Sequence, residues 1–106
     1  MVNEDEKQFN DLVQNIGRIA SSFNGLARQA CVVYAGHVNE IVETQSLDTN
    51  RIEHLLDGML GFCFDPEMLQ LFKKLCRYYH KIDPQATASH VLAYREMWDD
   101  GTEERQ

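Results

Sequence analysis

The feature that most constrains the fold is an apolar heptad repeat within the first 41 residues of the chain. The repeat consists of Phe9, Leu12, Val13, Ile16, Ile19, Ala20, Phe23, Leu26, Ala27, Ala30, Val33, Tyr34, His37 and Ile41. Residues spaced in this way share one face of an α-helix. Glu4, Asp5 and Glu6 precede the repeat, where a helix N-terminus favours negative charge, and no proline interrupts it. The repeat therefore predicts one amphipathic helix over about residues 5–44.

Three shorter helical stripes follow, and two Asp-Pro pairs separate them. Asp65-Pro66 and Asp83-Pro84 each supply an N-cap carboxylate followed by a proline at the first helical position. The candidate N-caps of the preceding helix are Ser46, Asp48 and Thr49. Because no sustained alternation typical of strands occurs, the chain is predicted to be an all-α helical bundle, with one long N-terminal helix and three shorter ones joined by Asp-Pro turns.

Asn24-Gly25 is the weak point of the long helix, because a glycine inside a helix costs about 1 kcal/mol relative to alanine. A break there would give five helices of similar length. The heptad phase continues across the pair, which favours a continuous helix about 57 Å long beside partners of about 24 Å. Part of the stripe would then lack cover from its own chain. This mismatch predicts a homodimer with a seam at Ile16, Ile19, Phe23 and Leu26.

Composition indicates a single helical domain over residues 1–106, with residues 1–4 and 99–106 expected to fray. Apolar residues make up 43% and charged residues 25% of the chain, a balance that argues against a disordered protein. No stretch approaches the roughly 20 uninterrupted apolar residues of a membrane span, and the acidic start is unlike a signal peptide. Three cysteines without CxxC spacing are typical of free thiols in a reducing compartment, so a cytoplasmic location is expected.

Positive charge gathers in one segment of this acidic chain. The net charge is −7, yet residues 68–82 hold four bases and no acid. The candidate surface for an acidic partner or a phosphate is Lys73, Lys74, Arg77, Tyr78, His80 and Lys81, with Tyr78 available for stacking. The alternative is a solvated face that complements the C-terminal helix dipole or pairs with acids of the same chain.

Histidines form the other suggestive pattern, because three of the four precede an acid by three residues. The pairs are His37/Glu40, His54/Asp57 and His80/Asp83. On a helix this spacing suits two metal ligands or an oriented acid–base pair. Acids are abundant, however, and the Glu-x-x-His motif of dimetal bundles is absent, so exposed pairs without a metal are expected.

Enzyme signatures are missing from the sequence. It contains no Gly-rich phosphate loop, no Gly-x-Ser-x-Gly turn and no His-Glu-x-x-His motif. No catalytic residue, metal ligand or cofactor is therefore assigned. The predicted function is protein–protein interaction by a small acidic helical protein of the adaptor, immunity or inhibitor type. The alternatives are a nucleic-acid-binding regulator that uses residues 73–81, and a metal-binding helical bundle.

Overall fold

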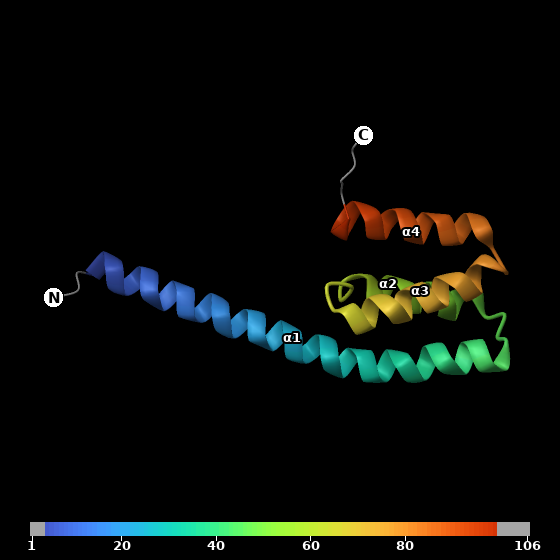
Figure 1. The fold of residues 1–106 in the computed structure, drawn as a ribbon, viewed down its shortest axis with the longest axis horizontal. Helices are drawn as coiled ribbons and strands as arrows, with labels where there is room; N and C mark the ends of the chain where they lie inside the picture. The colour runs from blue at the N-terminus through green and yellow to red at the C-terminus, as the bar shows by residue number, and fades with distance from the viewer. Residues whose placement is uncertain (1–3, 100–106) are drawn as a thin grey trace.

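The computed structural model describes residues 4–99, and in that range it contains four helices and no strand (Figure 1). The long helix α1 (Glu4–Thr44) is followed by α2 (Thr49–Leu60), α3 (Pro66–His80) and α4 (Pro84–Trp98). The predicted all-α architecture is therefore confirmed. Of the two ends expected to fray, Glu4 begins α1 and Asp99 follows α4, while the other positions lie outside the described residues.

α1 continues without a break through Asn24-Gly25, so the alternative of five short helices is wrong. No proline or capping side chain stops the helix there, and no atom crowds the place where a side chain of Gly25 would begin. The cost of one internal glycine, about 1 kcal/mol, is small compared with the loss of the hydrogen bonds that a break would open.

Only the C-terminal part of α1 belongs to the bundle; residues 4–26, called the arm from here on, project from it (Figure 1). Every residue of the arm is exposed, and the first buried residue of α1 is Ala27. At a rise of 1.5 Å per residue the arm extends about 34 Å. The longest dimension of the molecule is consequently 65 Å.

The core lies where the C-terminal part of α1 meets α2 and α3. Its buried members are Cys31, Val38, Ile41, Ile52, Leu56, Met59, Cys63, Met68, Phe72, Leu75, Cys76 and Tyr79. All three cysteines are buried free thiols, as the sequence predicted. Burial raises the pKa of Cys63 to about 12 and that of Cys76 to about 11, so both thiols stay neutral and pack as small apolar groups.

The face of α1 that enters the core differs from the predicted stripe. Cys31 and Val38, which lie off the heptad repeat, are buried, whereas Leu26 and Val33, which belong to it, are 52% and 59% exposed. A seven-residue repeat turns by about 20° per heptad on a straight α-helix. Between Phe9 and Ala30 the stripe has therefore rotated about 60° around the axis of α1. The bundle contacts the side of α1 on which the stripe began, and by Ala30 the stripe has rotated away from that side.

α4 is less buried than its predicted stripe suggested. Val91, Leu92 and Met97 remain exposed, and Thr87 is the one buried residue of α4. Polar contacts hold the helix instead, including the indole of Trp98, which donates a hydrogen bond to the Leu60 carbonyl at 2.8 Å. α4 packs mainly on α3 and leaves part of its apolar surface uncovered.

The two Asp-Pro turns form as predicted. The Asp65 carboxylate accepts a hydrogen bond from the Met68 amide, and the Asp83 carboxylate accepts one from the Ala86 amide, both at 3.0 Å. Asp48 caps α2 in the same way through the Arg51 amide.

Asp65→Ala and Asp83→Ala are each expected to lower the free energy of unfolding by about 0.5–2 kcal/mol, because each leaves a helix N-terminal amide without its cap. Thermal melts followed by circular dichroism measure the change. Glu96→Ala, which removes an exposed carboxylate that caps no helix, should leave the melting temperature nearly constant. Equal melting of the Asp variants and the unmodified chain would contradict the role of these caps.

Candidate functional site

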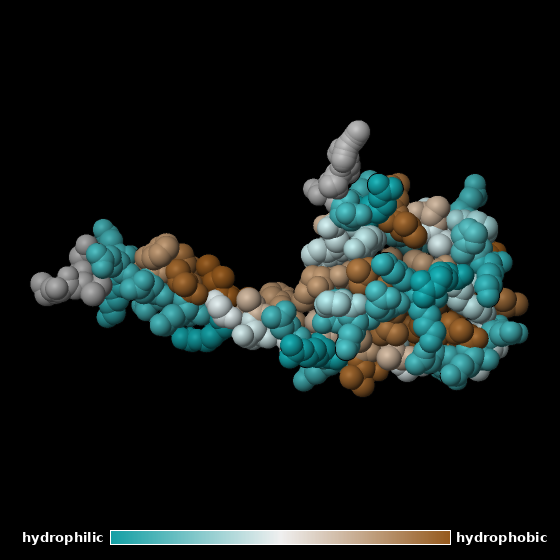
Figure 2. Space-filling model, in the orientation of Figure 1, coloured by the Kyte–Doolittle hydropathy of each residue, from teal (hydrophilic) through white to brown (hydrophobic). Residues whose placement is uncertain are grey.

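An apolar stripe lies uncovered along one side of the arm (Figure 2). Its seven large side chains are 51–64% exposed: Phe9, Leu12, Val13, Ile16, Ile19, Phe23 and Leu26. The four residues predicted for a dimer seam all belong to this stripe. At roughly 100 Å² for each half-exposed side chain, the stripe exposes about 700 Å², more than the largest apolar patch of most monomeric proteins.

The six charged side chains of the arm are spread around the helix, with Glu4 and Glu6 to either side of the stripe, at about 100° per residue. Lys7, Asp11 and Arg18 lie opposite the stripe, at about 100° per residue around the helix. Asp5, four residues before Phe9, instead lies in line with the stripe at its N-terminal end. Between Phe9 and Leu26 the stripe itself contains no charge, so this surface is suited to burial against another apolar surface.

The predicted basic surface is divided by its contacts. Tyr78 is half-buried and donates a hydrogen bond from its hydroxyl to the Ser46 carbonyl at 2.7 Å, so this side chain connects α3 to the loop after α1. The Lys74 ammonium donates to the Asn39 side-chain oxygen at 2.6 Å. The remaining members, Lys73, Arg77, His80 and Lys81, are exposed. None of these four forms an ion pair within residues 4–99, where the ion pairs involve Arg51 and His90 only.

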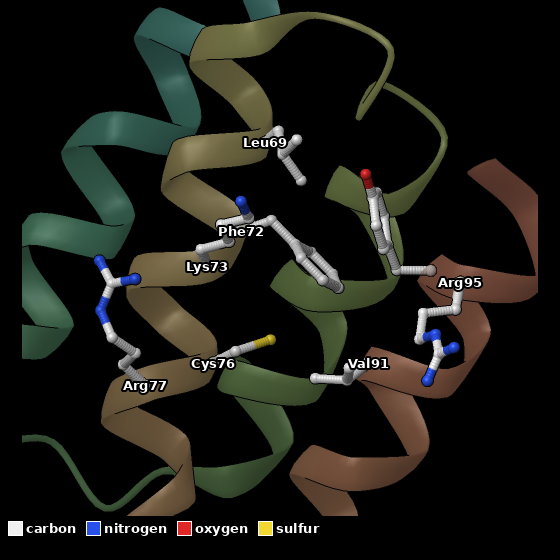
Figure 3. A pocket seen from close by; sticks show the side chains of 8 residues that line it. Leu69, Phe72, Lys73, Cys76, Arg77, Val91 and Arg95 are labelled. Carbon is white, nitrogen blue, oxygen red and sulfur yellow. The ribbon is translucent and has the colours of Figure 1, made fainter. Parts of the chain in front are cut away.

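A groove between α3 and α4 brings two of these bases beside a third that sequence analysis missed (Figure 3). Its volume is about 300 Å³, and its residues are Leu69, Phe72, Lys73, Cys76, Arg77, Val91, Tyr94 and Arg95. Phe72 and Cys76 from α3 point towards Val91 from α4, while Arg77 and Arg95 stand on opposite sides (Figure 3). Arg95 belongs to a different helix from the basic segment, and no local pattern reveals that the two helices are neighbours.

The three predicted His–acid pairs do not form hydrogen bonds or ion pairs among the described residues. Arg51 lies between the members of the first pair, 3.0 Å from the His37 ring and 2.7 Å from the Glu40 carboxylate. The guanidinium lowers the pKa of Glu40 by hydrogen bonding and by its charge. An arginine from α2 outcompetes His37 because it donates several charge-assisted hydrogen bonds in one plane.

Sequence analysis missed a cluster of titratable groups at the place where α2, α3 and α4 meet. Glu53 accepts a hydrogen bond from the Tyr79 hydroxyl at 2.6 Å, and its other oxygen lies 2.8 Å from the His90 ring. Asp57 lies 3.6 Å from the second ring nitrogen of His90. These contacts join residues up to 37 positions apart, which no local spacing predicts. The cluster fastens the sparsely buried α4 to the rest of the bundle.

Glu53 makes this cluster sensitive to acid. The hydrogen bond from Tyr79 is the largest cause that lowers the pKa of Glu53 from its ordinary value of 4.5, and the hydrogen bond from His90 is the next. Burial is the largest cause that raises the pKa of Tyr79 to about 12, and its hydrogen bond to the Glu53 carboxylate is the next. A carboxyl with a lower pKa in the folded chain stabilises the fold above its unfolded pKa. The stabilisation is lost as the pH falls through the folded pKa.

Glu53→Gln is therefore expected to melt at a lower temperature at pH 7 and to lose less stability than the unmodified chain between about pH 5 and pH 3. Melting temperatures across this range measure the effect. Some acid sensitivity should remain, because Glu40 also has a lowered pKa. Glu96→Gln serves as the exposed control. An unchanged pH profile in Glu53→Gln would show that the cluster contributes no acid-sensitive stability.

A second cluster lies where α1 meets the start of α3. The donor atoms of Cys31, Asp65 and Glu67 lie within 4.8 Å of one another. Asp65 already caps α3, and burial together with the two carboxylates raises the pKa of Cys31, which keeps a thiol in place of the thiolate that metals bind. A structural zinc site needs four ligands, and this group supplies three. We assign no metal to it.

The basic side chains of α3 are expected to be dispensable for folding. Changing Lys73, Lys74, Arg77 and Lys81 together to Gln should leave helicity unchanged and melting nearly so, because exposed substitutions usually stay within about 0.5 kcal/mol each. Lys74, which contacts Asn39, should account for most of any loss. Circular dichroism melts test this, and loss of the fold would show that these bases act in folding instead of in binding.

Neither the helices nor comparison with known proteins assigns this chain to a class. Among residues 4–99, no helix has the length and apolar character needed to cross a membrane. No protein-family model, curated protein or solved structure matches the chain. Its function is therefore inferred from the geometry of the arm and of the bundle.

Proposed function

We propose that this protein is an interaction module of the adaptor, immunity or inhibitor type, which uses its arm for contacts between protein chains and catalyses no reaction. The observation that carries this proposal is the stripe of seven large apolar side chains, each more than half exposed. Burial of such an apolar surface is strongly favourable, and the bundle of the same chain does not cover it. The absence of catalytic motifs from the sequence agrees with a role in binding.

The proposed partner on the arm is a second copy of the chain. Covering about 700 Å² on each of two copies removes at least about 1,400 Å² from water, which reaches the 1,200–2,000 Å² size of specific protein interfaces. If a second copy covers the stripe, no further, unidentified protein is needed as the partner. The three buried free thiols support the further proposal that the protein works in the reducing environment of the cytoplasm.

Light scattering at micromolar concentration tests the proposal, because it reports mass independently of the elongated shape. A homodimer should give twice the chain mass of 12.3 kDa. A mass of 12.3 kDa at every concentration up to the solubility limit would overturn the proposed homodimer.

A further inference from the structure

We infer that the arm of one copy docks into the α3–α4 groove of a second copy, with its acidic N-terminal end against the cations of that groove. This inference rests on the proposed homodimer and identifies the surface that receives the arm.

The groove combines an apolar floor with a cationic rim. Phe72 and Cys76 are nearly completely buried in its floor, and the burial-raised pKa of Cys76 keeps its thiol neutral. Lys73, Arg77 and Arg95 are exposed around the floor, and none forms an ion pair within the described residues. An amphipathic helix with carboxylates beside its apolar face satisfies both parts of such a groove.

The N-terminal part of the arm has this composition. Residues 4–13 hold four acids and one base together with Phe9, Leu12 and Val13. Asp5 continues the apolar line towards the N-terminus, so a helix that lies on the groove with Phe9 and Leu12 over the floor also brings a carboxylate to the groove. Charge and apolar surface therefore match in the same orientation of the helix.

The stripe also faces the direction from which a second bundle could approach. Phe9, Val13 and Ile16 lie on the same side of α1 as the buried Ala27 and Val38, at about 100° per residue. The α3 helix packs on this side of α1 in its C-terminal part. A second copy that covers the stripe would pack on the same side of α1, farther along the arm. The arm, about 34 Å long, exceeds the length of α3, about 22 Å, so it can cross the whole groove.

Direct pairing of two arms is the competing arrangement, and charge disfavours it. Parallel arms would place the two acidic first turns together. Antiparallel arms in full apolar contact would pair Phe9 with Leu26, which brings Glu4 of one copy level with Cys31 of the other. Asp65 and Glu67 lie within 4.8 Å of the Cys31 sulfur, so acids would again meet acids. The α3–α4 groove offers cations instead.

Reciprocal docking gives a closed assembly. Each copy has one arm and one groove, so two copies related by a two-fold axis can fill both grooves with both arms. The stripe residues between Ile16 and Leu26 then lie between the two bundles. This arrangement accounts for the predicted seam and assigns a role to Lys73 and Arg77 of α3, which form no ion pair within the described residues.

A charge-swap experiment tests the inference in full-length protein. The groove variant carries Arg77→Glu and Arg95→Glu, and the tip variant carries Asp5→Lys, because Asp5 is the carboxylate that lies in line with the stripe. Lys81→Glu is the control, since Lys81 is exposed on the same basic segment but lies outside the groove. Circular dichroism verifies that each variant is folded, and sedimentation equilibrium measures the dimer dissociation constant.

The groove variant and the tip variant are each expected to dimerise at least about tenfold more weakly than the unmodified chain, because like charges then face each other. An equimolar mixture of the two should recover dimers, because each reversed arm meets a reversed groove. Lys81→Glu should dimerise normally. A groove variant that dimerises as tightly as the unmodified chain would overturn the docking site while leaving the homodimer intact. A monomeric unmodified chain would overturn the homodimer itself, and the docking site with it.

Discussion

Phe23→Asp is expected to convert the proposed homodimer into a monomer of 12.3 kDa while the bundle stays folded. Phe23 is 52% exposed in the middle of the arm and lies outside the core of its own chain. In the proposed dimer its ring is covered, so the substitution should remove burial worth about 1.5–3 kcal/mol at each of two symmetric positions. A carboxylate in an apolar seam adds a desolvation cost. Dimerisation should therefore weaken by more than about a hundredfold.

Light scattering and circular dichroism together measure this result. Val32→Asp is a matched control, because Val32 is also on α1 and is 76% exposed, yet it lies outside the stripe. Phe23→Leu keeps an apolar side chain and should keep most of the dimer. If Phe23→Asp remained a dimer, the arm would not form the interface, whichever surface of the second copy were involved.

Leu56→Ala is expected to lower the free energy of unfolding by about 2–5 kcal/mol, the largest effect on stability among the changes considered. Leu56 is completely buried in α2 and belongs to the core with residues of α1 and α3. Removing its branched end leaves a cavity that the surrounding helices close only in part. For a domain of this size, such a loss is a large fraction of the total stability.

Chemical denaturation at one fixed protein concentration measures this loss, with Leu92→Ala as the matched control. Leu92 also lies in a helix but is 54% exposed, so its replacement should change the free energy of unfolding by no more than about 0.5 kcal/mol. Equal effects of the two substitutions would contradict the placement of the core. Because neither residue belongs to the arm, the difference between the two free energies of unfolding reports on the bundle alone.

Much of the helical architecture could be predicted from local sequence. The continuous α1, the capped starts of α3 and α4 at Asp65 and Asp83, and the burial of the three cysteines all agree with the sequence analysis. Hydrogen bonding within a helix spans four residues, and a cap acts over three. These features therefore depend on neighbours along the chain, which a sequence pattern displays directly.

Which faces meet was decided only by the tertiary structure. Cys31 and Val38 are buried in the core, and Val33 is exposed, because the heptad stripe rotates around the axis of a straight helix. Arg95 joins Lys73 and Arg77 around one groove, and the Glu53 contacts with Tyr79 and His90 span α2, α3 and α4. Such contacts depend on how whole helices pack, and spacing within a single helix carries no information about the neighbour that it will meet.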